Sequence, residues 1–385
     1  MWLLLVLSCS HTHPALSPAT GAGAAVSGAA ASGPAATDPS AALAHCALAR
    51  TTRVATKDGA TIALHHHPAS GPPVVLVHGI SSNHHFWDLD AEHSFADWLA
   101  ARGHDVWLLD LRGHGDATVD RRGQPQLSGW RVDDYGRYDV AAAVDHVRGC
   151  TGYDQVAYVG HSMGGMVGSI YAATGGAGNL SAMVLVGSPG TFSKTAPMMG
   201  LARTGLAAGG LALVSLDSAP LGAVAADLNR GPLKVRIQER LYNPENFVPE
   251  TIDRMLRSIV SPMSRGEMAH FARMIQDERF QSWDRSIGYL DALRDVKVPA
   301  YVVVGMGDRV AAPEWVEAYA TAFGGPVELF RAGKVSGLVA DYGHLDLGLG
   351  ERAATEIFPR IDAWLDRYPP ARDGRPPAAF VHTVP

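Results

Sequence analysis

The sequence has little of several features that assign a chain to a class of proteins. Lys and Arg number 32 against 38 Asp and Glu, and no basic stripe is visible, which argues against a nucleic-acid partner. No nucleotide-binding fingerprint and no H-E-x-x-H or Cys–His spacing is present, so we expect neither a cofactor nor a metal ion. Cysteine is scarce: beyond Cys9 there is one pair, Cys46 and Cys150, either a disulfide in an oxidising compartment or two thiols.

The start of the chain lacks Lys and Arg ahead of a short apolar run, residues 1–8, that leads into Cys9. A run this short is typical of a secretion signal rather than a membrane span. Val6-Leu7-Ser8-Cys9 resembles the lipobox of bacterial lipoproteins, in which the cysteine is acylated and becomes the new N-terminus. We predict export, either as a cell-envelope lipoprotein attached to the membrane through a lipid on Cys9 or as a secreted protein with a plain signal peptide.

The two ends of the chain have a composition that cannot bury a core. Residues 9–48 are rich in Ala, Gly, Ser and Pro and carry no charge before Asp38, which predicts a flexible tether. Residues 371–385 contain three Pro, two Arg and one Asp and are predicted to be irregular. We divide the remainder into a first core segment at 49–190, a helical cap at 191–297 and a second core segment at 298–370.

Short apolar runs alternate with helical stretches through the body of the chain, which is 47% hydrophobic overall. Continuous apolar strands imply a sheet buried on both faces, and their alternation with helices gives an α/β fold with a mostly parallel central sheet and helices on both faces. Asp58-Gly59, between the first two runs, is a hairpin signal. We predict strands at residues 52–55, 61–65, 74–77, 105–109, 155–159, 183–186, 300–304 and 327–330. We predict helices at residues 91–101, 135–147, 165–173, 313–323 and 352–368.

The predicted cap interrupts this alternation, because residues 191–297 look helical and contain no clear strand. Within them, residues 196–216 carry Arg203 as their only charge and are long enough to cross a membrane. Their glycines, alanines and Arg203 favour a cap helix instead. The cap is also rich in methionine, which we expect to fill gaps in a core, with the lining of an acyl pocket as the alternative.

Gly160-His161-Ser162-Met163-Gly164 fits the pattern G-x-S-x-G, the nucleophile elbow. An apolar strand precedes it and a helix follows, which is the context that the motif needs. The turn is so tight that small residues must flank the serine, and it lifts the serine Oγ above the sheet. The helix N-terminus favours negative charge developing there. Ser162 is therefore the predicted nucleophile, and the backbone N–H of Met163 a predicted oxyanion donor.

A serine hydroxyl needs a base, and in this arrangement the acid and then the histidine follow the serine along the chain. Asp308 comes just after the strand predicted at 300–304, and His344 lies in a loop after the last strand. Asp308 would orient His344 without taking its proton. Asp341 and Asp346 are alternatives to Asp308, which we interpret as residues of a solvated loop or a helix cap.

The second oxyanion donor is expected after the strand at 74–77, where the chain reads His78-Gly79-Ile80. Gly79 allows a close approach of the backbone, so the N–H of Ile80 is the predicted donor, and His78 is predicted to support the loop rather than act as a base. Further histidines occur at residues 65–67 and 84–85. A metal site is the alternative there, but we expect these histidines to face solvent.

Together these segments resemble the α/β-hydrolase superfamily over residues 52–368, and more closely the acid lipases of the gastric and lysosomal type and their bacterial esterase and lipase relatives. The likeness lies in residues 95–108, in 138–140 leading into the elbow at 158–162, and in 343–347. It implies the α/β-hydrolase fold with a helical cap, a triad of Ser162, Asp308 and His344, and oxyanion donors at Ile80 and Met163.

The chain departs from the acid lipases at two positions. Arg112-Gly113-His114-Gly115 is the general hydrolase R-G-H-G rather than their R-G-N, and Met163 stands where they have glutamine. The resemblance therefore carries the fold and the triad, but not triglyceride lipase activity.

The function predicted from these residues is hydrolysis of small-molecule or lipid carboxylic esters through an acyl-enzyme on Ser162. An acyltransferase with the same triad is one alternative, since an alcohol then replaces water. A non-catalytic, surface-tethered binding protein is another, but such a protein has no reason to retain Asp308 and His344. An epoxide hydrolase or dehalogenase would need Asp in place of Ser162.

Overall fold

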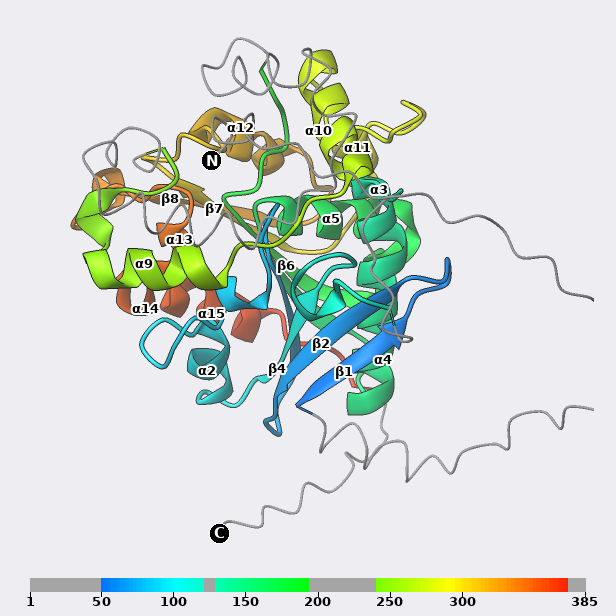
Figure 1. Ribbon diagram of the computed structural model, residues 1–385, viewed down its shortest axis with the longest axis horizontal. Helices are drawn as coiled ribbons and strands as arrows, with labels where there is room; N and C mark the ends of the chain where they lie inside the picture. Colours follow the sequence, from blue (N-terminus) through cyan, green and yellow to red (C-terminus); the bar gives the residue numbers. More distant parts are fainter. Residues whose placement is uncertain (1–49, 121–128, 194–239, 373–385) are drawn as a thin grey trace, which may run out of the picture.

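The computed structural model describes residues 50–120, 129–193 and 240–372 (Figure 1). All eight predicted strands are present there in one sheet of order β1-β2-β4-β3-β5-β6-β7-β8. The first three in this order pair antiparallel, and the remaining neighbours are parallel, which confirms the mostly parallel sheet. The strands are β1 (Thr51–Ala55), β2 (Thr61–His67), β3 (Pro73–Val77), β4 (Asp105–Asp110), β5 (Val156–His161), β6 (Leu180–Val186), β7 (Ala300–Gly305) and β8 (Val327–Ala332).

Helices cover both faces of the sheet, as predicted (Figure 1). The side chains of β3 alternate between the two faces: Val75 and Val77 pack in one apolar cluster, and Val74 and Leu76 in the other. The first cluster includes α4 (Ala141–Thr151) and α5 (Met163–Tyr171). The second includes α2 (Phe95–Ala100), α14 (Ala353–Glu356) and α15 (Phe358–Arg367). This two-sided burial explains why the strands are continuously apolar.

Several helices are shorter than their apolar patterns predicted. The helix expected from residue 91 begins at Phe95, because the Ser94 side chain accepts the N–H of Asp97 at 2.9 Å and caps it. The last expected helix is split at Ile357 into α14 and α15. Pro359 lies in the first turn of α15, where a residue without an N–H is tolerated, whereas inside a longer helix it would remove a hydrogen bond.

The described part of the cap, residues 240–297, is helical as predicted. It comprises α9 (Pro249–Ser258), α10 (Arg265–Asp277) and the short α11 (Tyr289–Ala292). Met255 of α9 is buried in the apolar cluster on one face of the sheet and Met274 of α10 in the cluster on the other, so these methionines fill cores. Residues 194–239, and with them the stretch at 196–216, lie outside the described residues.

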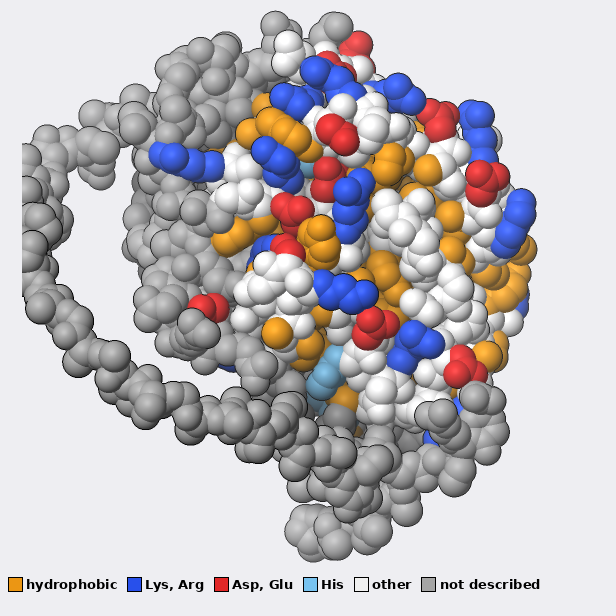
Figure 2. All heavy atoms as spheres, turned by 90° about the vertical axis from the view of Figure 1, so that its right-hand side faces the viewer, with side chains coloured by type: hydrophobic (Ala, Val, Ile, Leu, Met, Phe, Trp, Pro, Cys, Tyr) orange, Lys and Arg blue, Asp and Glu red, His pale blue; other side chains and the backbone are white. Residues whose placement is uncertain are grey.

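Among the described residues, no helix is both long enough and apolar enough to cross a membrane. On the face of the molecule that carries α4 and β1, cationic and anionic side chains are interspersed (Figure 2). Cys150, near the end of α4, is disulfide-bonded. Cys9 and Cys46 lie outside the described residues, as do the predicted signal segment and tether.

Candidate active site

Ser162 lies in the turn between β5 and α5 with φ 52° and ψ −119°, a backbone conformation that residues other than glycine rarely adopt. The chain is so tight here that a Cβ on Gly160 would lie 2.4 Å from the backbone of Gly164. A Cβ on Gly164 would lie 2.4 Å from the carbonyl oxygen of Val77. Both glycines of the G-x-S-x-G pattern are thus required by close backbone approach. Strained backbone of this kind persists where the surrounding structure holds it, typically at functional sites.

His344 and Asp308 are hydrogen-bonded, with 2.7 Å between Nδ1 of the histidine and Oδ2 of the aspartate. The other carboxylate oxygen of Asp308 accepts the backbone N–H groups of Val310 and Ala311 at 2.8 and 2.9 Å, so the carboxylate is held in place. Because Nδ1–H donates to the carboxylate, Nε2 of a neutral His344 carries the lone pair that a base needs. Both side chains are buried.

His161, directly before Ser162, connects the elbow to the loop of His344. Its Nε2 donates to the backbone carbonyl of His344 at 3.1 Å, and its ring stacks on Phe86 with 3.9 Å between centroids. Burial lowers the pKa of His161 well below its usual range, so the ring stays neutral. Ser162, Asp308 and His344 follow the parallel strands β5, β7 and β8, so all three lie at the carboxyl edge of the sheet.

The loop after β3 lies against Ser162. A Cβ on Gly79 would be 3.1 Å from Cβ of Ser162. His78 supports this loop: its Nδ1 donates to the carbonyl oxygen of Gly79 at 2.8 Å, and its Nε2 accepts the N–H of Leu111 at 3.3 Å. Burial lowers the pKa of His78 to about 3, so it is neutral and both nitrogens are engaged. Met163 is the first residue of α5, where the helix offers its N–H no acceptor.

The two alternative acids lie elsewhere. Asp341 accepts a backbone N–H from the start of its own loop at 2.8 Å. Asp346 is fully buried and accepts the side chain of Asn246 at 2.6 Å and the N–H of Gly343 at 2.8 Å. Burial raises the pKa of Asp346 to about 6. Our interpretation of Asp346 as a solvated or capping residue was therefore wrong, because the cap residue Asn246 folds over it.

The histidines of β2 and of the loop after β3 do not face solvent, contrary to expectation. His66 is buried, with its Nε2 2.7 Å from Oδ1 of Asp105. His65 Nε2 and His84 Nδ1 both bond to Oδ2 of Asp110, at 3.0 and 2.8 Å. Although burial opposes it, the hydrogen bond to Asp110 raises the pKa of His84. These histidines pair with aspartates of β4, which the sequence spacing does not reveal.

His65, His84 and Asp110 place their donor atoms close enough together to be considered as a metal site. The two imidazoles, however, stack face to face with centroids 3.7 Å apart and 24° between their planes. One nitrogen of each ring also bonds to the same oxygen of Asp110, so each is engaged without an ion. We interpret the group as a hydrogen-bonded cluster around a buried carboxylate. A second group of donor atoms comprises His104, Asp362 and Asp366.

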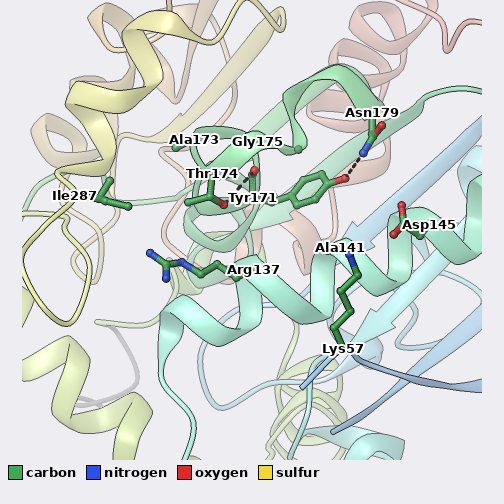
Figure 3. Close-up of a pocket in the computed structure, with 11 residues that line it drawn as sticks. Lys57, Arg137, Ala141, Asp145, Tyr171, Ala173, Thr174, Gly175, Asn179 and Ile287 are labelled. Carbon is green, nitrogen blue, oxygen red and sulfur yellow. Dashed lines mark hydrogen bonds between the residues drawn. The ribbon is translucent and has the colours of Figure 1, made fainter. Parts of the chain in front are cut away.

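A surface hollow of about 580 Å³ lies at the far end of α5 from Ser162 (Figure 3). Lys57, Arg137 and Tyr171 line it, and the hydroxyl of Tyr171 accepts a hydrogen bond from Asn179 at 2.8 Å. None of its 11 lining residues is a histidine or cysteine. Since Ser162 precedes the first residue of α5 and Tyr171 is the last, this hollow is separate from the candidate active site.

The cap reaches the loop after β3 through two serines that the sequence patterns did not indicate. The N–H of Ser261 donates to the carbonyl oxygen of Ser81 at 3.0 Å, and Oγ of Ser81 donates to the carbonyl oxygen of Ser261 at 2.8 Å. The only indication in the sequence that Ser81 matters is its position directly after the predicted oxyanion donor Ile80. Ser261 lies in a cap with no motif to mark it.

Comparison with known proteins agrees with this arrangement. Human lipase member K is 24% identical over 377 residues, which cover 82% of this chain and 87% of that protein. Human lysosomal acid lipase/cholesteryl ester hydrolase is 33% identical over 133 residues, or 30% of this chain and 33% of that protein. The structure of a thermophilic esterase from Thermogutta terrifontis aligns with a TM-score of 0.55 at 20% identity, covering 83% of this chain and 99% of that one.

Some of these likenesses are local. The chain spans only 26% to 31% of the length of three further curated lipases that it matches at 32% to 34% identity. The family match is broader: residues 72–347 match the family described as the alpha/beta hydrolase fold. That range takes in the elbow, the loop after β3, Asp308 and His344. The chain therefore belongs to the α/β hydrolase fold family.

Proposed function

We propose that this chain is a serine hydrolase that cleaves carboxylic esters through an acyl-enzyme on Ser162. The observation that carries the proposal is the 2.7 Å hydrogen bond between His344 and Asp308, formed next to an elbow that holds Ser162 at positive φ. That bond keeps the proton on Nδ1 of His344 and leaves Nε2 to act as a base.

In the acylation step, Oγ of Ser162 attacks the ester carbonyl carbon while Nε2 of His344 takes the hydroxyl proton. The N–H groups of Met163 and Ile80 bind the developing oxyanion, and each such donor contributes about 3 kcal/mol of transition-state stabilisation. The carbon–oxygen bond of the ester then breaks, and His344 returns the proton to the leaving alcohol. Asp308 stabilises the transient imidazolium and remains ionised.

In the deacylation step, water attacks the acyl-enzyme and gives its proton to His344, which passes it to Ser162 as the acid leaves. An alcohol in place of water would transfer the acyl group instead. The relatives named as lipases support a lipid ester or a smaller carboxylic ester as the substrate. We infer no cofactor, since the proposed chemistry needs only these side chains and backbone donors.

The test is turnover of p-nitrophenyl esters from acetate to palmitate, together with labelling by a fluorophosphonate. Wild type should hydrolyse and be labelled, and Ser162→Ala should do neither. Ser169→Ala is the matched control, because Ser169 is also buried and in α5 but its Oγ donates to the carbonyl oxygen of Gly165, at 2.9 Å. Full labelling of Ser162→Ala would show that another residue is the nucleophile. Added alcohol acceptors separate hydrolysis from acyl transfer.

We also propose that the chain is exported and attached to the cell envelope through a lipid on Cys9, with secretion as the alternative. The proposal is supported by the apolar start of the chain and by the disulfide at Cys150, since disulfides persist in oxidising compartments. Mass spectrometry of the mature N-terminus tests it. A mature chain beginning at an acylated Cys9 is the expected result, and an unmodified chain that starts further along would overturn lipidation.

A further inference from the structure

The residue that follows the proposed oxyanion donor Ile80 has an unusual backbone. Ser81 has φ 53°, in the left-handed region that residues other than glycine rarely occupy. Such a conformation costs about 1 to 3 kcal/mol and persists only when neighbours hold it. Gly79, on the other side of Ile80, packs against Ser162. The position of the Ile80 N–H is therefore fixed by contacts of both neighbouring residues. Gly79 contacts the elbow, whereas Ser81 contacts another part of the protein.

The part that Ser81 contacts is the cap. Ser81 and Ser261 exchange two hydrogen bonds, of 3.0 Å from N–H to carbonyl and 2.8 Å from Oγ to carbonyl. Both residues are buried, with 6% and 2% of their surface exposed, so water does not compete strongly for these bonds. Asn83 adds two more, donating through Nδ2 to the carbonyl oxygen of Ser258 at 2.9 Å and to Oγ of Ser261 at 3.1 Å.

Ser261 also binds the loop after β4. Oγ of Ser261 accepts the N–H of Gly115 at 3.1 Å, and Gly115 is the last residue of the R-G-H-G motif. The segment from Ser258, the last residue of α9, to Ser261 thus joins the loop after β3 to the loop after β4. These cap residues bind the loop carrying Ile80 at Ser81 and Asn83.

We propose that Ser81 and Ser261 are positioning residues that place the N–H of Ile80 for the oxyanion. Through Ser261, the cap would then contribute to catalysis by fixing the position of this donor. This inference rests on the proposed function of Ser162. An oxyanion donor acts only within a narrow distance of the developing charge, about 2.7 to 3.1 Å. Loss of the Ser81–Ser261 clamp should therefore weaken binding of the transition state more than binding of the substrate.

The experiment uses the full chain with three substitutions. Ser81→Gly removes the Oγ bond while accepting the positive φ, and Ser261→Ala removes the bonds to Asn83 and Gly115. Ser264→Ala is the matched control: Ser264 is a buried cap serine whose Oγ binds the carbonyl oxygen of Trp130 at 3.0 Å, away from the loop after β3. The measurements are kcat, KM, inhibition by an alkyl boronic acid that mimics the tetrahedral adduct, and the thermal midpoint.

We expect Ser81→Gly, which loses one of the two clamp bonds, to lower kcat by roughly 10-fold and to weaken boronate inhibition by a similar factor, with KM within about twofold of wild type. Ser261→Ala keeps both clamp bonds, because Ser261 makes them through its backbone, and should lower kcat less, by loosening Asn83 and Gly115. Ser264→Ala should lower the thermal midpoint but leave kcat and inhibition unchanged. Equal losses of kcat in Ser81→Gly and Ser264→Ala would overturn the inference, since both would then report stability alone. If Ser261→Ala does not fold, Ser81→Gly decides by the same criteria.

These outcomes separate the inference from the proposed function. A wild-type chain that neither turns over esters nor reacts with a fluorophosphonate overturns both. A wild-type chain that does both, with Ser81→Gly unchanged in kcat and in boronate inhibition, overturns only the role of the cap in placing Ile80.

Discussion

Nδ1 of His344 lies 2.7 Å from Oδ2 of Asp308, although the two residues are 36 positions apart in the chain. The bond fixes which nitrogen of the imidazole carries the proton. Asp308→Asn is nearly isosteric, but its amide can donate to Nδ1 and so stabilise the wrong tautomer. We expect kcat to fall by about 10⁴-fold, as in other serine triads, with little change in the thermal midpoint. Asp341→Asn is the control and should retain wild-type kcat.

The strained backbone of Ser162 leads to a prediction about stability. Ser162→Gly should stabilise the fold by roughly 1 kcal/mol, because glycine adopts φ 52° without strain. Ser162→Ala should show no such gain, since alanine keeps the Cβ. Both variants should be inactive. Urea unfolding of the three proteins measures the difference, and equal midpoints for the glycine and alanine variants would mean that the elbow stores no strain.

The sheet and the positions of the proposed triad residues could be predicted from sequence because both depend on local patterns. Continuous apolar runs identify strands buried on both faces, and the elbow, Asp308 and His344 each follow such a strand. The early histidines could not be placed this way. Their burial depends on pairing between β2 and β4, which brings His66 to Asp105 and His65 to Asp110 across the sheet.

The cap illustrates a second limit. Its helical character follows from composition, but the contact between Ser261 and Ser81 joins residues 180 positions apart. Serine is common in turns, so neither residue stands out until the two loops are placed side by side. The split between α14 and α15 was readable in principle, since Pro359 interrupts the apolar pattern.

The cluster around Asp110 gives a prediction that separates hydrogen bonding from metal binding. Asp110→Asn should destabilise the fold by about 3 to 5 kcal/mol, because it removes the negative charge to which His65 and His84 are hydrogen-bonded in a buried position. EDTA should leave the thermal midpoint of wild type unchanged. Asp116→Asn, with 55% of its side chain exposed, is the control and should change stability by less than about 0.5 kcal/mol. A midpoint lowered by EDTA and restored by Zn²⁺ would favour the metal site.

Glu267 of α10 joins the cap to the core through a fully buried carboxyl group. Its Oε2 accepts the hydroxyl of Tyr135 at 2.9 Å and the N–H of Ser264 at 3.1 Å. Its Oε1 has no hydrogen-bond partner among the described residues and lies 3.8 Å from Nε2 of His114, the histidine of R-G-H-G. Burial raises the pKa of Glu267 to about 7 and lowers that of His114 to about 4. The neutral, protonated Glu267 can therefore direct its proton at the lone pair of a neutral His114.

The sign of the pH dependence follows from this raised pKa. A carboxyl group whose pKa rises from 4.5 in the unfolded chain to about 7 in the fold stabilises the protein fully below pH 4.5, and this contribution is lost as the pH rises through about 7. Above that pH the loss amounts to about 3 kcal/mol. Glu267→Gln keeps a neutral side chain at every pH, so it should unfold like wild type at pH 4.5 and be more stable at pH 8. Glu250→Gln, at an exposed position of α9, is the control and should follow wild type throughout. Parallel stability curves for wild type and Glu267→Gln between these two pH values would show that Glu267 does not titrate in this range.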